Sequence, residues 1–385
     1  MKKSQIAEST TNLLIDCTFI GKDWAPFNSL SIYAARLIQG FLEYGTSHTI
    51  VLLWDDNEEL FDSLVGRSYD KIVLKRKDLL FNWRPLYRLF GLLPKKLRQE
   101  LKKHDIPAVL HPFHYDVMFV FPHPIRQYAI MHDHFLIDRV KDKRGKISFY
   151  IWHKYQMMLL WKFTHLISIS KSTHDIMLQQ EGIESSIVYN SIPFDFSIQE
   201  QPVDLVKDTP FILDVNRFQF YKNPQTLVRA LSLIKDKIPH KLYLKGDKDL
   251  EGVRDMLRNL AEELGLQDRV IIDDTVRTEG EMRYLYSHAD LFVSPSLKEG
   301  FGWTPIEATI LKTPALVSDI EVFNEVLCGR IPKFNPDSPE DLASRMLEIL
   351  NNPMSEQEKT ELADFFLEKY SLKNQVEHLE EIMNS

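Results

Sequence analysis

Cysteine is scarce in this sequence. The 385 residues include only two, Cys17 and Cys328, which lie far apart and at no spacing that metal ligands use. A disulfide framework and a zinc-finger-like site are therefore both excluded. A reducing compartment is the expected environment.

Long apolar runs are also missing. No stretch approaches the roughly 18 consecutive apolar residues that a membrane-spanning helix needs. Residues 1–3 imitate the basic end of a signal peptide, but Glu8, Asn12 and Asp16 interrupt the apolar core that would have to follow. We therefore expect an intracellular, cytoplasmic protein.

The chain has no general excess of positive charge. It carries 47 Lys and Arg against 55 Asp and Glu, which gives a net charge of −8. General binding to nucleic acid needs a basic footprint, so we expect no nucleic-acid partner.

One stretch reverses this balance. Residues 71–103 contain eleven Lys or Arg against two acids, a local charge of +9, with aromatic and apolar residues interleaved. Such a basic amphipathic segment can lie on an anionic membrane, where each Lys or Arg contributes ~1 kcal/mol. The composition equally suits a helical hairpin with a solvated basic face. The first interpretation predicts peripheral contact with the inner face of a membrane, and both remain open at this point.

Strand-like and helix-like segments alternate along the chain, which is typical of α/β folds with parallel sheets. Apolar residues at helical spacing predict helices over 30–42, 151–161 and 279–289, and a helical tail from residue 340. A length of 385 residues suits two domains of roughly 150–200 residues, with a polar linker over 193–210. Short β-branched and aromatic runs predict strands over 13–15, 49–54, 71–74, 126–131, 166–169, 187–189, 211–215, 241–245, 270–272, 291–293 and 314–317.

The stretch 294–307 combines a strand end, a glycine-rich loop and a helix start. Gly300 and Gly302 free the loop backbone, and Thr304 is predicted as the N-cap, with Pro305 at the first helical position. A helix start presents unpaired N–H groups and suits a phosphate. Glu307, three residues beyond the predicted cap, is equally explained by a Thr-x-x-Glu capping box that needs no ligand.

Polar residues also follow two other predicted strands. Arg217 and Lys222 come just after strand 211–215, where bases could neutralise a diphosphate or simply face solvent. His132 follows strand 126–131 and is itself followed by Asp133 and His134. A metal would need a third ligand, which does not follow at a sensible spacing, so a polar loop is the alternative.

The stretch 294–308 resembles the Glu-x7-Glu signature of family-four retaining glycosyltransferases (group 1 glycosyltransferases), which use nucleotide-activated sugars. Arg217 and Lys222 resemble the family's Gly-Arg and Lys-Asn pattern, and His132 resembles the family's His-Asp. Ten positions of the signature match in order: Ser294, Pro295, Ser296, Glu299, Gly300, Phe301, Gly302, Pro305, Glu307 and Ala308.

The resemblance implies an α/β fold of the GT-B type, with two Rossmann-like domains facing across a central cleft. Residues 1–200 would bind the acceptor, with a C-terminal helix over about 365–385 packing back on them, and residues 201–364 would bind the donor. It implies a retaining, metal-independent enzyme with no cofactor. A sugar would pass from a nucleotide sugar to a hydroxyl of a glycan or lipid-linked saccharide in cell-surface polysaccharide synthesis.

The resemblance also implies roles for single residues. Arg217 and Lys222 would hold the donor pyrophosphate, Glu299 the hydroxyls of the donor sugar and Glu307 those of the ribose, while His132 would face the donor sugar. The nucleotide sugar would also contact the loop and helix start at Gly300, Phe301, Gly302, Trp303 and Thr304.

Two departures from the family pattern support an alternative. The turn over 26–29 has no glycine, and Asn216 stands where the family has glycine before Arg217. A nucleotide-binding pseudoenzyme of the same fold is therefore kept as a second hypothesis. A third is a glycosidase that uses Glu299 and Glu307 as acid and base.

Overall fold

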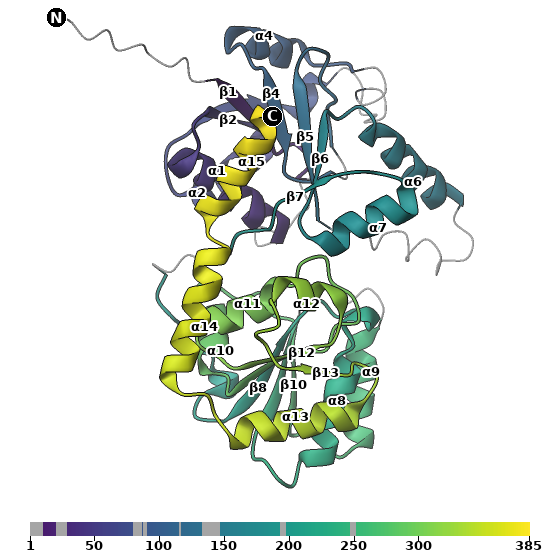
Figure 1. Cartoon of the computed structure of the whole chain (residues 1–385), viewed down its shortest axis with the longest axis vertical. Coiled ribbons are helices and arrows are strands. Elements are labelled where there is room, and N and C mark those ends of the chain that lie inside the picture. Colours follow the sequence, from purple (N-terminus) through teal and green to yellow (C-terminus); the bar gives the residue numbers. More distant parts are fainter. Residues whose placement is uncertain are drawn as a thin grey trace, which may run out of the picture. The chain divides into compact units, whose positions relative to one another are not determined.

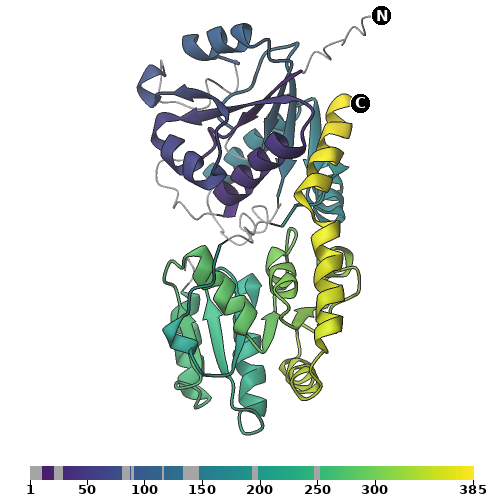
Figure 2. The same ribbon diagram turned by 90° about the vertical axis from the view of Figure 1, so that its left-hand side faces the viewer.

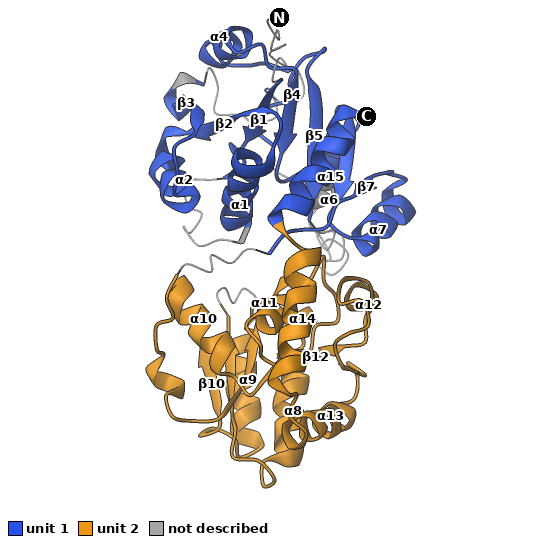
Figure 3. Ribbon diagram, turned by 60° about the vertical axis from the view of Figure 1, so that its left-hand side comes forward, with its two compact units in different colours: residues 1–193, 372–385 blue, residues 194–371 orange. Residues whose placement is uncertain are grey.

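The computed structural model describes residues 11–20, 29–79, 87, 91–114, 117–132, 147–192, 198–246 and 252–385. The chain divides into two compact units (Figure 3). Unit 1 consists of Met1–Pro193 together with Leu372–Ser385, and unit 2 of Phe194–Ser371. The predicted turn over 26–28 and most of 80–90 in the basic stretch lie outside the described residues, as do Asp133 and His134.

In the described part of unit 1, seven parallel strands form one sheet in the order β3-β2-β1-β4-β5-β6-β7. The inner strands β1, β2, β4, β5 and β6 are almost entirely buried, as in parallel sheets covered by helices on both faces, and their sequences are accordingly almost continuously apolar. The bounds of all seven strands are β1 Asn12–Asp16, β2 His48–Trp54, β3 Asp70–Leu74, β4 Ala108–His111, β5 Arg126–Met131, β6 His165–Ser168 and β7 Ser186–Ile187.

The last helix of the chain belongs to unit 1 and packs against its first helix (Figure 1). Gln375 of α15 accepts a hydrogen bond from the Ser191 hydroxyl at 2.8 Å and donates one to the Tyr33 hydroxyl at 3.1 Å. A Cβ at Gly40 of α1 would lie 2.8 Å from the Leu372 side chain, so this glycine permits the close approach. The helices of unit 1 are α1 Ser29–Tyr44, α2 Glu58–Val65, α4 Lys95–Lys103, α6 Ile147–Leu160, α7 Lys171–Glu181 and α15 Leu372–Asn384.

In the described part of unit 2, six parallel strands form a second sheet in the order β10-β9-β8-β11-β12-β13. Helices lie around this sheet in Figures 1 and 2. The strands are β8 Phe211–Val215, β9 Lys241–Lys245, β10 Val270–Asp273, β11 Leu291–Ser294, β12 Ala315–Ser318 and β13 Lys333–Phe334. The helices are α8 Pro224–Ile234, α9 Val253–Glu263, α10 Glu279–His288, α11 Trp303–Ile310, α12 Glu321–Val326, α13 Pro339–Asn351 and α14 Glu356–Lys369.

The predicted α/β architecture with parallel sheets is confirmed, and each predicted strand has a counterpart. Two strands were missed from the sequence, β4 and β13. The predicted helix over 151–161 begins four residues earlier, at Ile147. Among the described residues, no helix is both long enough and apolar enough to span a bilayer. The acceptor and donor roles of the two units stay predictions.

Candidate functional site

The predicted site residues of unit 2 follow two strands that lie side by side. β8 pairs with β11 in the middle of the sheet, and the order reverses there, because β9 and β10 continue on one side while β12 and β13 continue on the other. Ligands of open α/β sheets bind at the carboxyl ends of strands beside such a reversal. The topology therefore brings the loop after β8 and the loop after β11 together at the favoured position.

Lys222 and Glu299 form a buried ion pair at this position. Lys222 Nζ lies 2.6 Å from Glu299 Oε1, and the two side chains are only 11% and 10% exposed. The Ser296 hydroxyl donates to the same oxygen at 2.8 Å. Burial alone would lower the pKa of Lys222, but the Glu299 carboxylate offsets this and the pKa is raised. Lys222 is therefore charged, and among the described residues no group donates a hydrogen bond to Glu299 Oε2.

A second acid, Asp214, lies near the end of β8 and is close enough to interact electrostatically with both Lys222 and Glu299. The side chain is 3% exposed and accepts a hydrogen bond from Asn216 Nδ2. Burial raises the pKa of Asp214 to about 7, although the Asn216 hydrogen bond and the charge of Lys222 lower it in part. The Asp214 carboxyl, which titrates near neutral pH, therefore lies close to the Lys222–Glu299 ion pair.

The helix after the glycine loop starts earlier than predicted. α11 begins at Trp303, and its N-cap is Gly302, whose φ of 83° is in the left-handed region. Thr304 is the second helical residue, so the prediction of Thr304 as the cap, with Pro305 first in the helix, was wrong. A Cβ on residue 302 would lie 2.4 Å from the Phe323 ring, so both the backbone and the packing require glycine here.

Glu307 makes no capping box, and that interpretation was wrong as well. Its Oε2 accepts a hydrogen bond from the Tyr286 hydroxyl of α10 at 2.6 Å. Burial raises the pKa of Glu307 to about 7, while the Tyr286 hydrogen bond lowers it in part. In the described structure no group donates to Glu307 Oε1, which leaves one carboxylate oxygen for a ligand.

Arg217 lies in a different environment from Lys222. Its side chain is exposed, and no ion pair or side-chain hydrogen bond joins it to another described residue. The two predicted cations are thus a buried, paired lysine and an exposed arginine on the same loop.

His132 belongs to unit 1, directly after β5. Its ring is 7% exposed, lies edge-on to the Tyr33 ring at 4.4 Å, and places Nε2 2.8 Å from the carbonyl oxygen of Pro112. Burial lowers the pKa of His132 to about 4, although the hydrogen bond to Pro112 raises it in part. The imidazole is therefore neutral at pH 7, with Nε2–H as the donor to Pro112.

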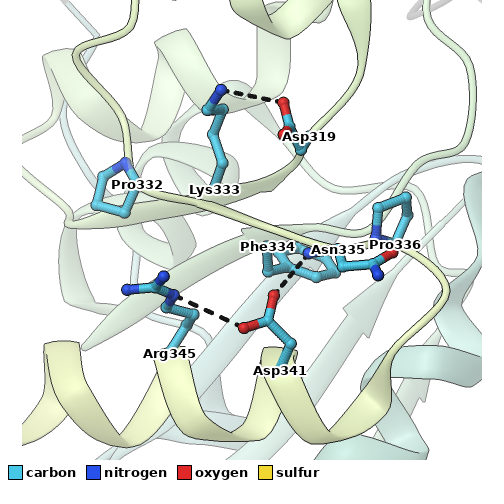
Figure 4. Close-up of a pocket in the computed structure, with 8 residues that line it drawn as sticks. All are labelled: Asp319, Pro332, Lys333, Phe334, Asn335, Pro336, Asp341 and Arg345. Carbon is cyan, nitrogen blue, oxygen red and sulfur yellow. Dashed lines mark hydrogen bonds and ion pairs between the residues drawn. The ribbon is translucent and has the colours of Figure 1, made fainter.

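A pocket lies elsewhere in unit 2, at the ends of β12 and β13 (Figure 4). It encloses about 640 Å³, and its bases are paired: Lys333 with Asp319 at 3.0 Å and Arg345 with Asp341 at 3.8 Å. None of the predicted site residues lines it. Across the described ranges, no group of three or more His, Cys, Asp or Glu side chains could hold a metal ion.

Two of the residues around the site were missed from the sequence. Asp214 had a signal, because it is a charged residue inside an otherwise apolar strand. Tyr286 had none, since its contact with Glu307 spans 21 positions and depends on how α10 packs beside α11.

The region that holds these residues matches a known family. Residues 195–363 match the family described as "Glycosyl transferases group 1". The chain carries a group 1 glycosyltransferase domain. The matched range includes the Lys222 and Glu299 pair and the Tyr286 and Glu307 pair, and the predicted family is confirmed for this part of the chain.

Several curated relatives match about half of this chain. The O-antigen chain mannosyltransferase RfbU of Salmonella typhimurium is 29% identical over 192 residues, which are 49% of this chain and 52% of that protein. The serotype-specific mannosyltransferase WbdA of Escherichia coli is 28% identical over 200 residues, 49% of this chain and 24% of that protein. The matched region thus spans about half of RfbU and about a quarter of WbdA.

Solved structures match nearly the whole chain. HepE of Anabaena, solved in complex with UDP and glucose, is 14% identical with a TM-score of 0.71, over 97% of this chain and 99% of that one. A glycosyltransferase from Rickettsia africae is 16% identical with a TM-score of 0.70, over 97% and 98%. At such identities the likeness establishes the fold alone, and it confirms the predicted GT-B type.

Proposed function

We propose that the protein transfers a sugar from a nucleotide sugar to a hydroxyl group of an acceptor saccharide. The observation that carries this proposal is the buried pair of Lys222 and Glu299 at the strand-order reversal of unit 2, within the matched family region. At the carboxyl ends of parallel strands, fixed cations can bind a diphosphate and hydrogen-bond acceptors can bind the hydroxyls of the sugar joined to it.

The pairs Lys222–Glu299 and Tyr286–Glu307 each leave polar atoms without a hydrogen bond to another described residue, and we propose that these atoms bind the nucleotide sugar. Lys222 has three N–H donors and uses one on Glu299, so two remain for the diphosphate. Glu299 Oε2 would accept from a hydroxyl of the donor sugar, and Glu307 Oε1 from a hydroxyl of the ribose. Arg217, exposed on the same loop, would supply the second positive charge.

The proposed chemistry needs no metal and retains the configuration at the sugar. The bond between the anomeric carbon and the diphosphate oxygen breaks, and a bond from the same carbon to the acceptor oxygen forms. The acceptor's proton passes to the departing diphosphate. Lys222, Arg217 and the amides near Gly300 and Gly302 would stabilise the negative charge that builds on that leaving group. His132, neutral and held by Pro112, would orient substrate rather than remove a proton.

The relatives suggest which substrates to test first. RfbU and WbdA are named as mannosyltransferases, and RfbU acts on the O-antigen chain according to its name. HepE is described with UDP and with UDP-glucose. We therefore propose mannose or a related hexose as the transferred sugar, and a growing saccharide of a cell-surface polysaccharide, free or lipid-linked, as the acceptor. Nucleic acid is not a proposed partner.

The basic stretch 71–103 supports peripheral contact of a cytoplasmic enzyme with an anionic membrane. In α4, Leu97 and Leu101 are buried while five bases are exposed. Binding to anionic vesicles should weaken at high salt and in a variant with glutamine at those bases, since the attraction is screened. Salt-independent binding would contradict this role. The five bases are Lys95, Lys96, Arg98, Lys102 and Lys103.

The experiment that tests the proposed function is donor turnover by the full chain. The protein is incubated with a panel of UDP- and GDP-sugars, with and without saccharide acceptors, and release of the nucleoside diphosphate is measured. We expect one donor to be consumed, and Lys222→Ala to slow this by ~10²–10³. Lys333→Ala, which removes a lysine from an exposed ion pair of the same unit, is the matched control and should turn over normally.

The same experiment separates the alternatives. Tight binding of a nucleoside diphosphate without turnover of any donor would favour the pseudoenzyme, for which the Asn216 side chain bonded to Asp214 is the supporting observation. Cleavage of an unactivated glycoside without nucleotide affinity would favour the glycosidase. Either result would overturn the proposed transfer reaction.

A further inference from the structure

Three buried polar side chains from distant parts of unit 1 form a hydrogen-bonded network that reaches His132. Gln375 of α15 donates from Nε2 to the Tyr33 hydroxyl of α1 at 3.1 Å and accepts at Oε1 from the Ser191 hydroxyl at 2.8 Å. The three side chains of this network are at most 3% exposed. Buried polar groups that bond one another specify one arrangement of the core. Gln375 therefore fixes the position of the Tyr33 side chain.

The helix that carries Gln375 is itself held in register on unit 1. Gly40 of α1 permits a close approach, since a Cβ there would lie 2.8 Å from side chains of α15. Near the other end of α15, the main-chain oxygen of Met383 accepts a hydrogen bond from the Tyr128 hydroxyl at 3.1 Å. Figure 3 shows α15 beside α1 within unit 1. Because both ends of α15 are anchored, Gln375 meets Tyr33 at a defined place.

Tyr33 in turn presents its ring to the imidazole of His132. The two rings are nearly perpendicular, with an interplanar angle of 84° and centroids 4.4 Å apart, an arrangement that aromatic pairs prefer. The imidazole also donates from Nε2–H to the Pro112 carbonyl oxygen at 2.8 Å. That hydrogen bond selects the tautomer in which Nδ1 carries the lone pair. The Tyr33 ring limits the tilt of the imidazole about this bond, so the two contacts together define the direction of Nδ1.

We infer that Tyr33 and Gln375 are positioning residues that hold the His132 imidazole with Nε2–H on Pro112 and Nδ1 as the acceptor for a substrate hydroxyl. These roles rest on the proposed function, in which His132 orients substrate. Tyr33 acts through the ring contact, and Gln375 acts through the Tyr33 hydroxyl. A displacement of about 1 Å in an orienting group can slow a reaction by ~10², so a fixed imidazole matters for the rate.

The rival explanation is that the network only packs α15 against α1, and Tyr128 supplies the matched control. Its hydroxyl also donates to α15, and its side chain is 3% exposed. No ring contact joins Tyr128 to His132 in the described part of the chain. Tyr128→Phe therefore removes a buried hydrogen bond to the same helix without touching the imidazole.

The test observes His132 directly, by ¹⁵N NMR of the imidazole side chains of the full chain. The His132 signals are assigned from their loss in His132→Gln. The wild type should show a single tautomer with the proton on Nε2, and Tyr33→Leu should show a mixture of the two tautomers. Tyr33→Phe and Gln375→Leu should each shift the signals less, in the same direction. Their combination should shift them no further than Tyr33→Phe alone, because both changes remove the same hydrogen bond.

Donor turnover, measured in parallel, separates positioning from binding. We expect kcat to fall by ~10² in Tyr33→Leu and by about tenfold in Tyr33→Phe. The affinity for the nucleoside diphosphate should stay within about twofold in both variants, since its proposed contacts lie in unit 2. Absence of turnover in the wild type would count against the proposed function, whereas the NMR signals would still show whether Tyr33 and Gln375 hold His132.

Two results would overturn these positioning roles. One is that His132 keeps its wild-type signals in Tyr33→Leu and in Gln375→Leu. The other is that Tyr128→Phe shifts those signals as much as Tyr33→Phe does, which would reduce the network to packing of α15. If Tyr33→Leu does not fold, the comparison of Tyr33→Phe and Gln375→Leu with Tyr128→Phe decides.

Discussion

Replacing Asp214 by Asn should remove a large part of the pH dependence of the stability of unit 2. Asp214 is 3% exposed, and burial raises its pKa to about 7 against the opposing effects of Asn216 and Lys222. In an unfolded chain the pKa of Asp is about 3.9. The folded state therefore binds this proton more tightly than the unfolded state does.

The sign and size follow from that difference. The stabilising contribution of protonated Asp214 is complete below the unfolded pKa and is lost as the pH rises through the folded value. A shift of about three pKa units corresponds to roughly 4 kcal/mol in all, of which roughly 2–3 kcal/mol is lost between about pH 5 and about pH 8. Asparagine cannot ionise, and its carbonyl oxygen can still accept the hydrogen bond from Asn216 Nδ2.

The assay is urea denaturation at several pH values, read by hydrogen exchange of peptides that cover β8, so that unit 2 is followed separately. The Asp214→Asn variant should gain stability relative to the wild type as the pH rises from about 5 to about 8, by roughly 2–3 kcal/mol. Asp255→Asn on α9, where the side chain is 81% exposed, is the control and should follow the wild type. A constant difference between Asp214→Asn and wild type at every pH would refute the reasoning.

Three further predictions concern the donor site. Lys222→Ala should lose roughly 3–5 kcal/mol of folding stability as well as activity, because it leaves a buried carboxylate unpaired. Arg217 is exposed, so Arg217→Ala should slow donor turnover by ~10²-fold and leave the unfolding transition unchanged. Gly302→Ala should destabilise unit 2 by more than about 1 kcal/mol in thermal unfolding, since φ is 83° there. Tyr286→Phe removes the hydrogen bond that lowers the pKa of Glu307, so that pKa should rise and nucleoside diphosphate affinity at neutral pH should fall about tenfold in calorimetry.

The fold could be predicted from the sequence because strand and helix patterns alternate so regularly. The parallel arrangement then implied that the loops after 211–215 and 291–293 share one edge of a sheet, and the structure brings Lys222 within 2.6 Å of Glu299. Strand β13 was missed because Lys333–Phe334 contains no apolar run.

The details of the site could not be predicted because they depend on contacts between distant residues. Thr304 followed the local rules for a helix cap, but the position of Phe323 requires glycine at 302, and this glycine is the N-cap instead. Glu307 likewise satisfied a local capping rule, yet its partner is Tyr286 of a different helix. Local patterns thus identified the right loop but not the hydrogen bonds that organise it.

The most direct test of the central claim is hydrogen exchange of the full chain with and without nucleoside diphosphates. One diphosphate should protect the peptides that cover 216–223 and 294–308. In Lys222→Ala, compared with and without the same diphosphate, those peptides should show no protection by the ligand. Protection confined to other parts of unit 2, or equal protection in the Lys222→Ala variant, would contradict the donor site described above.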